Sequence, residues 1–94
     1  MRLEPFDRIV LIYGIEWRPG GFIDATRLLG FVQLNTNPFV AVVDSLERLE
    51  DSGLILIRRS RSSVRFRRTA QGMMLGQRLM RDSRISFMKA VGDP

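Results

Sequence analysis

The sequence predicts a small α+β domain that is mostly α-helical. Four segments carry apolar residues at helical spacing, and one later segment alternates apolar residues with arginines, which is typical of a β-hairpin. Breaks rich in Gly, Pro and Asn separate the segments. Because the chain has 94 residues, we expect residues 1–94 to form one domain.

Two helices are predicted in the first third of the chain. The first covers residues 5–17, where Pro5 suits the first turn. Gly21-Phe22-Ile23 is short and apolar and suggests a brief strand. The second helix covers residues 24–34, and Asp24 is a good N-cap for it.

A third helix is predicted over residues 38–52 with a clear start and a clear end. Asn37 can cap it, and Pro38 fits its first position. Gly53 is the residue type expected just after a helix end.

An antiparallel hairpin is predicted over residues 54–69. Val64 and Phe66 fall on one face of its second strand, and arginines fall on the other. The hairpin turns around Arg61-Ser62-Ser63. Since no Asn-Gly or Asp-Gly pair is present, we expect a turn longer than two residues.

The last predicted helix covers residues 70–91, with Thr69 as its cap. Met73, Met80 and Phe87 lie seven residues apart and therefore share one face. Methionine is flexible and fills irregular contacts, so this face suits either the domain core or a dimer interface.

Positive charge is concentrated in one part of the chain. Residues 1–51 contain five arginines and eight acids, residues 52–81 contain eight arginines and no acid, and residues 82–94 are balanced. Six of the eleven residues from Arg58 to Arg68 are arginine. An arginine guanidinium binds phosphate oxygens through a planar fork. This pattern is compatible with three explanations. The arginines bind an anionic partner, they form a solvated face without a partner, or they reflect a source organism whose proteins are generally rich in arginine.

The residue types that are absent exclude several kinds of site. The chain has no cysteine and no histidine, which excludes disulfides, imidazole metal ligands and Ser-His-Asp or Cys-His catalysis within the chain. Glu47, Glu50 and Asp51 read as a solvated helix face and not as catalytic carboxylates. We therefore expect no enzyme activity, no cofactor and no metal. No apolar run approaches the roughly 18 residues of a membrane span.

Several short motifs resemble the winged helix-turn-helix domains of MarR-like and PadR-like transcriptional regulators. They are Phe22-Ile23-Asp24, Leu28-Leu29-Gly30, Leu46-Glu47-Arg48-Leu49-Glu50, Ser52-Gly53-Leu54-Ile55 and Arg68-Thr69-Ala70-Gln71-Gly72. The resemblance covers about residues 8–80. It implies a three-helix core, a two-stranded wing and a C-terminal helix, with the third helix in the DNA major groove and the wing along the backbone or minor groove.

The resemblance also implies a set of DNA contacts. In the wing these are Arg58, Arg59, Arg61, Arg65, Arg67 and Arg68, and near the third helix they are Asn35, Thr36, Asn37 and Arg48. The third helix departs from the family pattern, because its first two turns offer Phe39, Val40, Ala41 and Asp44 where polar base-reading side chains are expected.

The sequence thus predicts an intracellular, nucleoid-associated protein that binds double-stranded DNA as a homodimer and regulates transcription, with Met73, Met80 and Phe87 at the dimer interface. Two alternatives remain open. One is a sequence-tolerant architectural DNA binder that uses only the wing, and the other is a winged-helix module that binds another protein.

Overall fold

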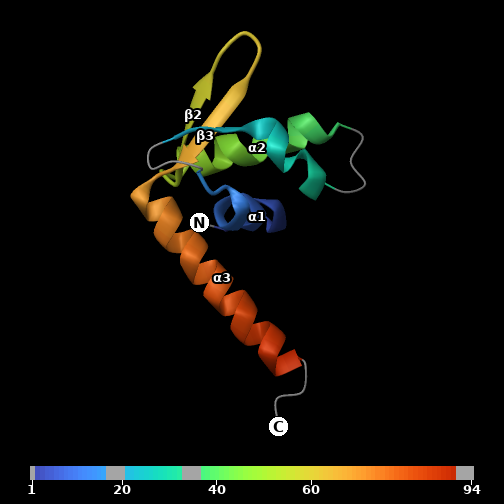
Figure 1. Ribbon diagram of the computed structural model, residues 1–94, viewed down its shortest axis with the longest axis vertical. Helices are drawn as coiled ribbons and strands as arrows, with labels where there is room; N and C mark the ends of the chain where they lie inside the picture. The colour runs from blue at the N-terminus through green and yellow to red at the C-terminus, as the bar shows by residue number, and fades with distance from the viewer. Residues whose placement is uncertain (1, 17–20, 33–36, 91–94) are drawn as a thin grey trace.

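The structure is a computed structural model that describes residues 2–16, 21–32 and 37–90, with the backbone alone for residues 83–90. In these ranges the chain forms a small α+β domain, mostly helical, with four helices and a three-stranded antiparallel sheet. Figure 1 shows the sheet and helices α1 and α2 grouped together, while α3 extends away from them. The longest dimension of the molecule is accordingly 54 Å.

Helix α1 spans Pro5–Tyr13 and is shorter than the helix predicted over residues 5–17. It ends because Gly14 follows it, with the Gly14 N–H donating to the Val10 carbonyl oxygen at 2.8 Å. A Cβ at position 14 would overlap both that oxygen and the ring of Phe66. The chain leaves the helix at this close approach, and Trp17 lies outside the described residues.

The helix predicted over residues 24–34 is a 3₁₀ helix, η1, at Ala25–Phe31. Asp24 caps it, accepting a hydrogen bond from the Thr26 N–H at 2.9 Å. The three-residue repeat of a 3₁₀ helix places side chains i and i+3 on one line. Ala25 and Leu28, which are both buried, use that line to reach the core.

Helix α2 spans Pro38–Asp51, close to the predicted 38–52. The Asn37 side chain accepts a hydrogen bond from the Val40 N–H at 3.3 Å and caps the helix. Its buried residues are Val42, Ser45, Leu46 and Leu49, which lie at helical spacing. After the helix, Gly53 adopts a φ of 76°, a left-handed conformation that favours glycine.

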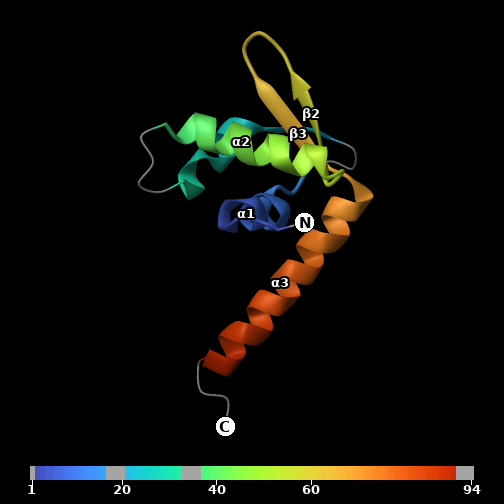
Figure 2. The ribbon, with the colours of Figure 1, turned by 180° about the vertical axis from the view of Figure 1, so that it is seen from behind.

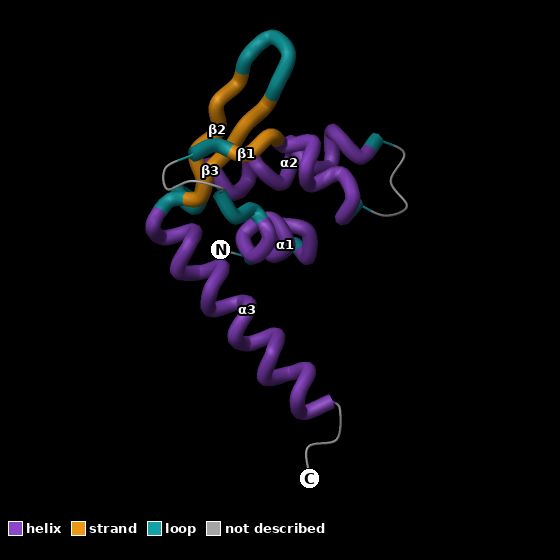
Figure 3. Tube along the Cα trace, viewed as in Figure 1, coloured by secondary structure: helices purple, strands orange, loops and turns teal. Residues whose placement is uncertain are grey.

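Strands β2 (Ile55–Arg59) and β3 (Val64–Arg68) form the predicted hairpin. A third strand, β1 (Ile23–Asp24), pairs with the other edge of β3, so the order is β1-β3-β2 (Figure 3). The predicted two-stranded ribbon is therefore a three-stranded sheet where β1 pairs with Phe66 and Arg65. The turn between β2 and β3 is closed by a hydrogen bond from the Ser60 N–H to the Ser63 carbonyl oxygen at 2.9 Å.

The core lies between α1, α2 and one face of the sheet. Its largest fully buried apolar side chains are those of Phe66, Leu11, Leu46, Leu49 and Ile55. Each of these residues comes from one of the four elements α1, α2, β2 and β3, so the packing of the sheet depends on the two helices beneath it.

Helix α3 spans Ala70–Ala90 and begins packed against the body of the domain. A Cβ at Gly72 would overlap the Leu54 carbonyl oxygen, and a Cβ at Gly76 would overlap that of Leu11. These two glycines let α3 approach the backbone of its neighbours closely. Further along, α3 leaves the domain, as the view from behind in Figure 2 also shows. No helix in the described part of the chain is both long enough and apolar enough to cross a membrane.

Substituting alanine for Gly76 is expected to lower the free energy of unfolding by about 1–3 kcal/mol, because backbone atoms cannot move aside as a flexible side chain can. Gly30→Ala is the matched control, since nothing lies within 4 Å of a Cβ placed there. Urea denaturation of both variants measures the difference. Equal stabilities would show that α3 does not need the close approach at Gly76.

Candidate nucleic-acid interface

The register of the hairpin decides which arginines share a face. Ile57 pairs with Phe66, and both point toward the core. The neighbouring pair, Arg58 and Arg65, therefore points to the opposite, outer face, where both side chains are exposed. Arg67 lies two residues from Arg65 and so belongs to the same face.

The outer face carries positive charge that the protein itself only partly balances. Like charges directly opposite each other in a sheet repel, and Arg58 and Arg65 are such a pair. Among the described residues, no salt bridge reaches the guanidinium of Arg58, Arg61 or Arg65. The hairpin itself contains no acidic residue.

One acid borders this face from β1. Asp24 lies opposite Arg65 in the register of β1 and β3. Hydrogen bonds from the backbone and side chain of Thr26 lower the pKa of the Asp24 carboxyl, and the charges of Arg65 and Arg27 add to the effect. The Asp24 carboxylate accepts its principal hydrogen bonds at the start of η1. Asp24 therefore offsets only part of the positive charge of the hairpin.

An aromatic ring lies under two of the outer-face arginines. The guanidinium carbon of Arg58 is 4.6 Å from the centroid of the Phe22 ring, and that of Arg67 is 5.3 Å from it. Both distances fall within the range of a cation–π interaction. Phe22 directly precedes β1, Arg58 lies in β2 and Arg67 lies in β3. The cluster therefore brings together residues from three separate segments of the chain.

Two other predicted contacts lie at the free end of the hairpin. Arg61 is exposed in the turn. Arg59 is exposed on the side of the hairpin nearest α2, and its guanidinium lies 3.4 Å from a Glu47 carboxylate oxygen. Both partners are about half exposed, with side-chain exposures of 51% and 53%. Such a pair contributes little stability, so Arg59 remains available to a stronger anionic partner.

Arg68, in contrast, points into the protein. Its side chain is 10% exposed, lies 3.5 Å from a Glu16 carboxylate oxygen and donates to the Leu11 carbonyl oxygen at 3.0 Å. Its backbone N–H also donates to Glu16, at 3.1 Å. Alternation along β3 places Arg68 on the inward face with Phe66, opposite Ile55 at the base of the hairpin, whereas the resemblance had implied a DNA contact. We therefore leave Arg68 out of the proposed interface.

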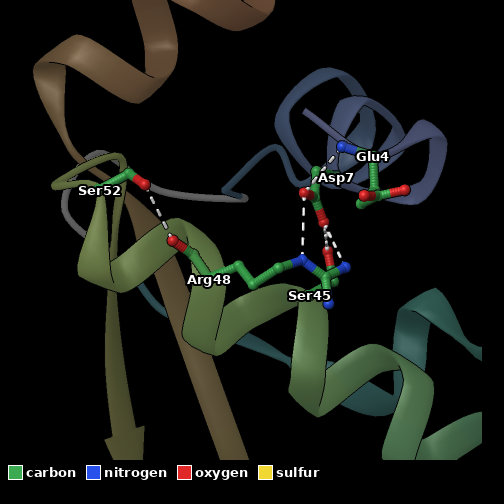
Figure 4. A network of polar contacts seen from close by, with 5 residues as sticks. All are labelled: Glu4, Asp7, Ser45, Arg48 and Ser52. Carbon is green, nitrogen blue, oxygen red and sulfur yellow. Dashed lines mark hydrogen bonds and ion pairs between the residues drawn. The ribbon is translucent and has the colours of Figure 1, made fainter. Parts of the chain in front are cut away.

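Arg48 is also engaged within the protein, in a polar network shown in Figure 4. Its guanidinium donates to the fully buried carboxylate of Asp7 at 2.9 Å. The Ser45 hydroxyl and the Glu4 N–H donate to the same carboxylate. This network joins α1 to α2, and Arg48 is likewise left out of the interface.

The pKa of the Asp7 carboxyl reflects this environment. Burial raises the pKa, but the hydrogen bonds from Arg48, Ser45 and the Glu4 backbone outweigh it and bring the pKa below its ordinary value of 3.8. Asp7 consequently stays ionised at neutral pH. Asp7 was not singled out from the sequence, although an acid among the apolar residues of an amphipathic helix was an available signal.

The start of α2 differs from the predicted DNA contact. Asn35 and Thr36 lie outside the described residues, while the Asn37 side chain caps the helix. The next exposed side chains include Phe39 and Val40, which are 40% and 48% exposed, and Asp44. This surface is apolar and acidic, in contrast to the outer face of the sheet.

The predicted dimer residues lie on α3. Met73 and Met80 are both 39% exposed, and the Phe87 side chain lies outside the described part. Met74 is exposed on another side of the helix. Met73 and Met80 thus do not belong to the domain core.

Within the described ranges, no group of three or more acidic side chains is placed to hold a metal ion. Comparisons of the chain with protein-family models, curated proteins and solved structures give no match.

Replacing Asp7 with asparagine is expected to lower the free energy of unfolding at pH 7 by about 1–3 kcal/mol, because a charged acceptor of several hydrogen bonds is lost. The folded pKa of Asp7 is lowered, so its contribution is present above pH 3.8 and disappears as the pH falls through the folded pKa. Urea denaturation between pH 7 and pH 2 measures this. A difference between the two proteins that did not shrink toward pH 2 would contradict it.

Proposed function

We propose that the protein binds double-stranded DNA through the outer face and the tip of the β2–β3 hairpin. The observation that carries the proposal is the exposed, directly opposed pair Arg58 and Arg65. Their mutual repulsion falls when phosphates lie against them. Arg67 extends the same positive surface along the hairpin, Arg61 adds charge in the turn, and Arg59 adds charge at the free end on the side nearest α2.

A narrow, two-stranded ribbon suits this role. Guanidinium groups on it can follow the phosphate backbone or enter a narrow minor groove, whose negative potential attracts arginine. The order of helices and strands agrees with the winged helix-turn-helix resemblance, which supports a role as a transcriptional regulator inside the cell. In that fold the hairpin is the wing.

The start of α2 favours sequence-tolerant binding over the reading of a specific operator. Phe39, Val40 and Asp44 offer few hydrogen bonds to base edges, and Asp44 is repelled by the DNA backbone. A sequence-specific regulator prefers its operator by a factor of about 10³ or more. Competition between unrelated duplexes therefore separates the regulator from the architectural binder.

One observation favours a protein-binding role as a second candidate. An open hollow of about 660 Å³ lies between α1 and α2, lined by residues that include Phe6, Phe31 and Val40. The Phe31 ring stacks on that of Tyr13, with centroids 5.0 Å apart, and both rings are exposed. A module that used only this surface would bind DNA barely or not at all.

Anisotropy of a labelled random duplex over a salt titration tests the DNA proposal. If four or five arginines contact phosphates, the slope of log K against log salt is expected to be about −3.6 to −4.5. Arg58→Ala/Arg65→Ala should reduce its magnitude by about 1.8. The matched control, Arg8→Ala/Arg78→Ala, removes the same charge from exposed positions on α1 and α3 and should leave the slope nearly unchanged. Binding without salt dependence, or an equal effect of both double variants, would rule out the hairpin as the DNA contact.

We also propose that two copies associate through the face of α3 that carries Met73 and Met80, since two linked hairpins gain avidity on one duplex. Sedimentation is expected to give a dimer at micromolar concentration and a monomer for Met80→Glu. Met74→Glu, which introduces the same charge on another side of α3, should remain a dimer. A wild-type monomer would end this part of the proposal.

A further inference from the structure

The Phe22 ring links arginines from two different strands. Arg58 belongs to β2 and Arg67 to β3, and the ring comes from the residue before β1. Both guanidinium carbons lie near the ring, at 4.6 Å and 5.3 Å from its centroid. Phe22 itself is half-buried, which limits its own movement.

This geometry gathers like charges before any ligand arrives. Without the ring, Arg58 would be repelled by Arg65 directly opposite and by Arg67 on the diagonal, and its long side chain would sample many rotamers. The negative face of the ring offsets part of that repulsion. A guanidinium that lies over a ring uses its flat face and keeps its N–H edge for in-plane hydrogen bonds. Those edge N–H groups are the ones that bind phosphate as a fork.

We propose that Phe22 is a positioning residue that holds Arg58 in advance, with its N–H edge ready for the phosphate backbone of a DNA duplex. The inference rests on the proposed function and adds to it which residue organises the charged surface. It also specifies the form of the ligand. Because the guanidinium of Arg58 already lies over the ring, Phe22 is not a platform on which an unpaired base stacks.

The test compares Phe22→Leu, Phe22→Tyr and Arg58→Gln with the wild type. All four proteins are titrated with the same labelled duplex, and with a single strand carrying the same number of phosphates, at several salt concentrations. Phe22→Leu removes the ring and keeps an apolar side chain and the net charge, whereas Phe22→Tyr keeps the ring. Urea denaturation establishes that each variant is folded at the temperature of the titration.

Phe22→Leu is expected to weaken duplex binding about threefold to tenfold at each salt concentration with an unchanged salt slope, because no charge is lost. Phe22→Tyr should bind within about twofold of the wild type. Arg58→Gln removes one positive charge, so it should reduce the magnitude of the salt slope by about 0.9. The duplex should bind more tightly than the single strand in every protein that keeps the ring.

NMR of the free protein provides a reading that does not depend on DNA. The Arg58 Nε–H proton is expected upfield in the wild type and in Phe22→Tyr, because of the ring current, and at an ordinary shift in Phe22→Leu.

Two results would overturn the inference while leaving the proposed function intact. The first is a Phe22→Leu variant that binds the duplex with wild-type affinity. The second is a wild-type protein that binds the single strand more tightly than the duplex, with a preference that Phe22→Leu abolishes. A wild-type protein that binds neither nucleic acid at low salt would instead overturn the proposed function, and the inference with it.

Discussion

The burial of Phe66 determines which way the arginines of the hairpin face. Phe66 is fully buried on the central strand, β3, and its ring lies against the backbone at Gly14. Successive side chains on a strand point to opposite faces, so Arg65 and Arg67 must point outward when Phe66 points inward. A slip of one residue in the register would bring arginines into the core and expose Phe66. The apolar core and the charged outer face are therefore two results of one packing constraint.

The arginines of this chain serve two different physical purposes. Arg48 and Arg68 bind acids that are buried or nearly so, and they hold α1 against α2 and the end of the hairpin. A buried carboxylate without its partner would be costly, which ties these two arginines to the folded state. Arg58 and Arg65 occupy the opposite situation, because their nearest charged neighbours include each other. The total number of arginines therefore overstates how many of them are available to bind a ligand.

The sequence predicted elements with strong local signals and missed contacts between distant segments. Asn37, Pro38 and Gly53 define α2 to within a residue, because caps act locally. The end of α1 at Tyr13 depends on a close approach between Gly14 and Phe66, which are distant in sequence. The pairing of β1 with β3 and the ion pair of Arg68 with Glu16 depend on the same kind of contact. For the same reason the alternation of β3 identified Arg65 and Arg67 as outward-facing but did not identify Phe22 beneath the guanidinium groups.

The distribution of charge and apolar surface also bears on how a duplex would approach. The outer face of the sheet is basic, while the exposed face of α2 carries Asp44, Glu47 and Asp51. A polyanion is attracted to the first surface and repelled by the second, and attraction of this kind acts before contact. If the protein binds DNA as proposed, the hairpin would therefore be the part of the molecule that meets it first. For α2 to follow it into a groove, the gain from contacts of Phe39 and Val40 with thymine methyl groups would have to exceed the repulsion of its acids. The proposed mode, sequence-tolerant binding through the hairpin, avoids this repulsion because it needs no contact between α2 and the duplex.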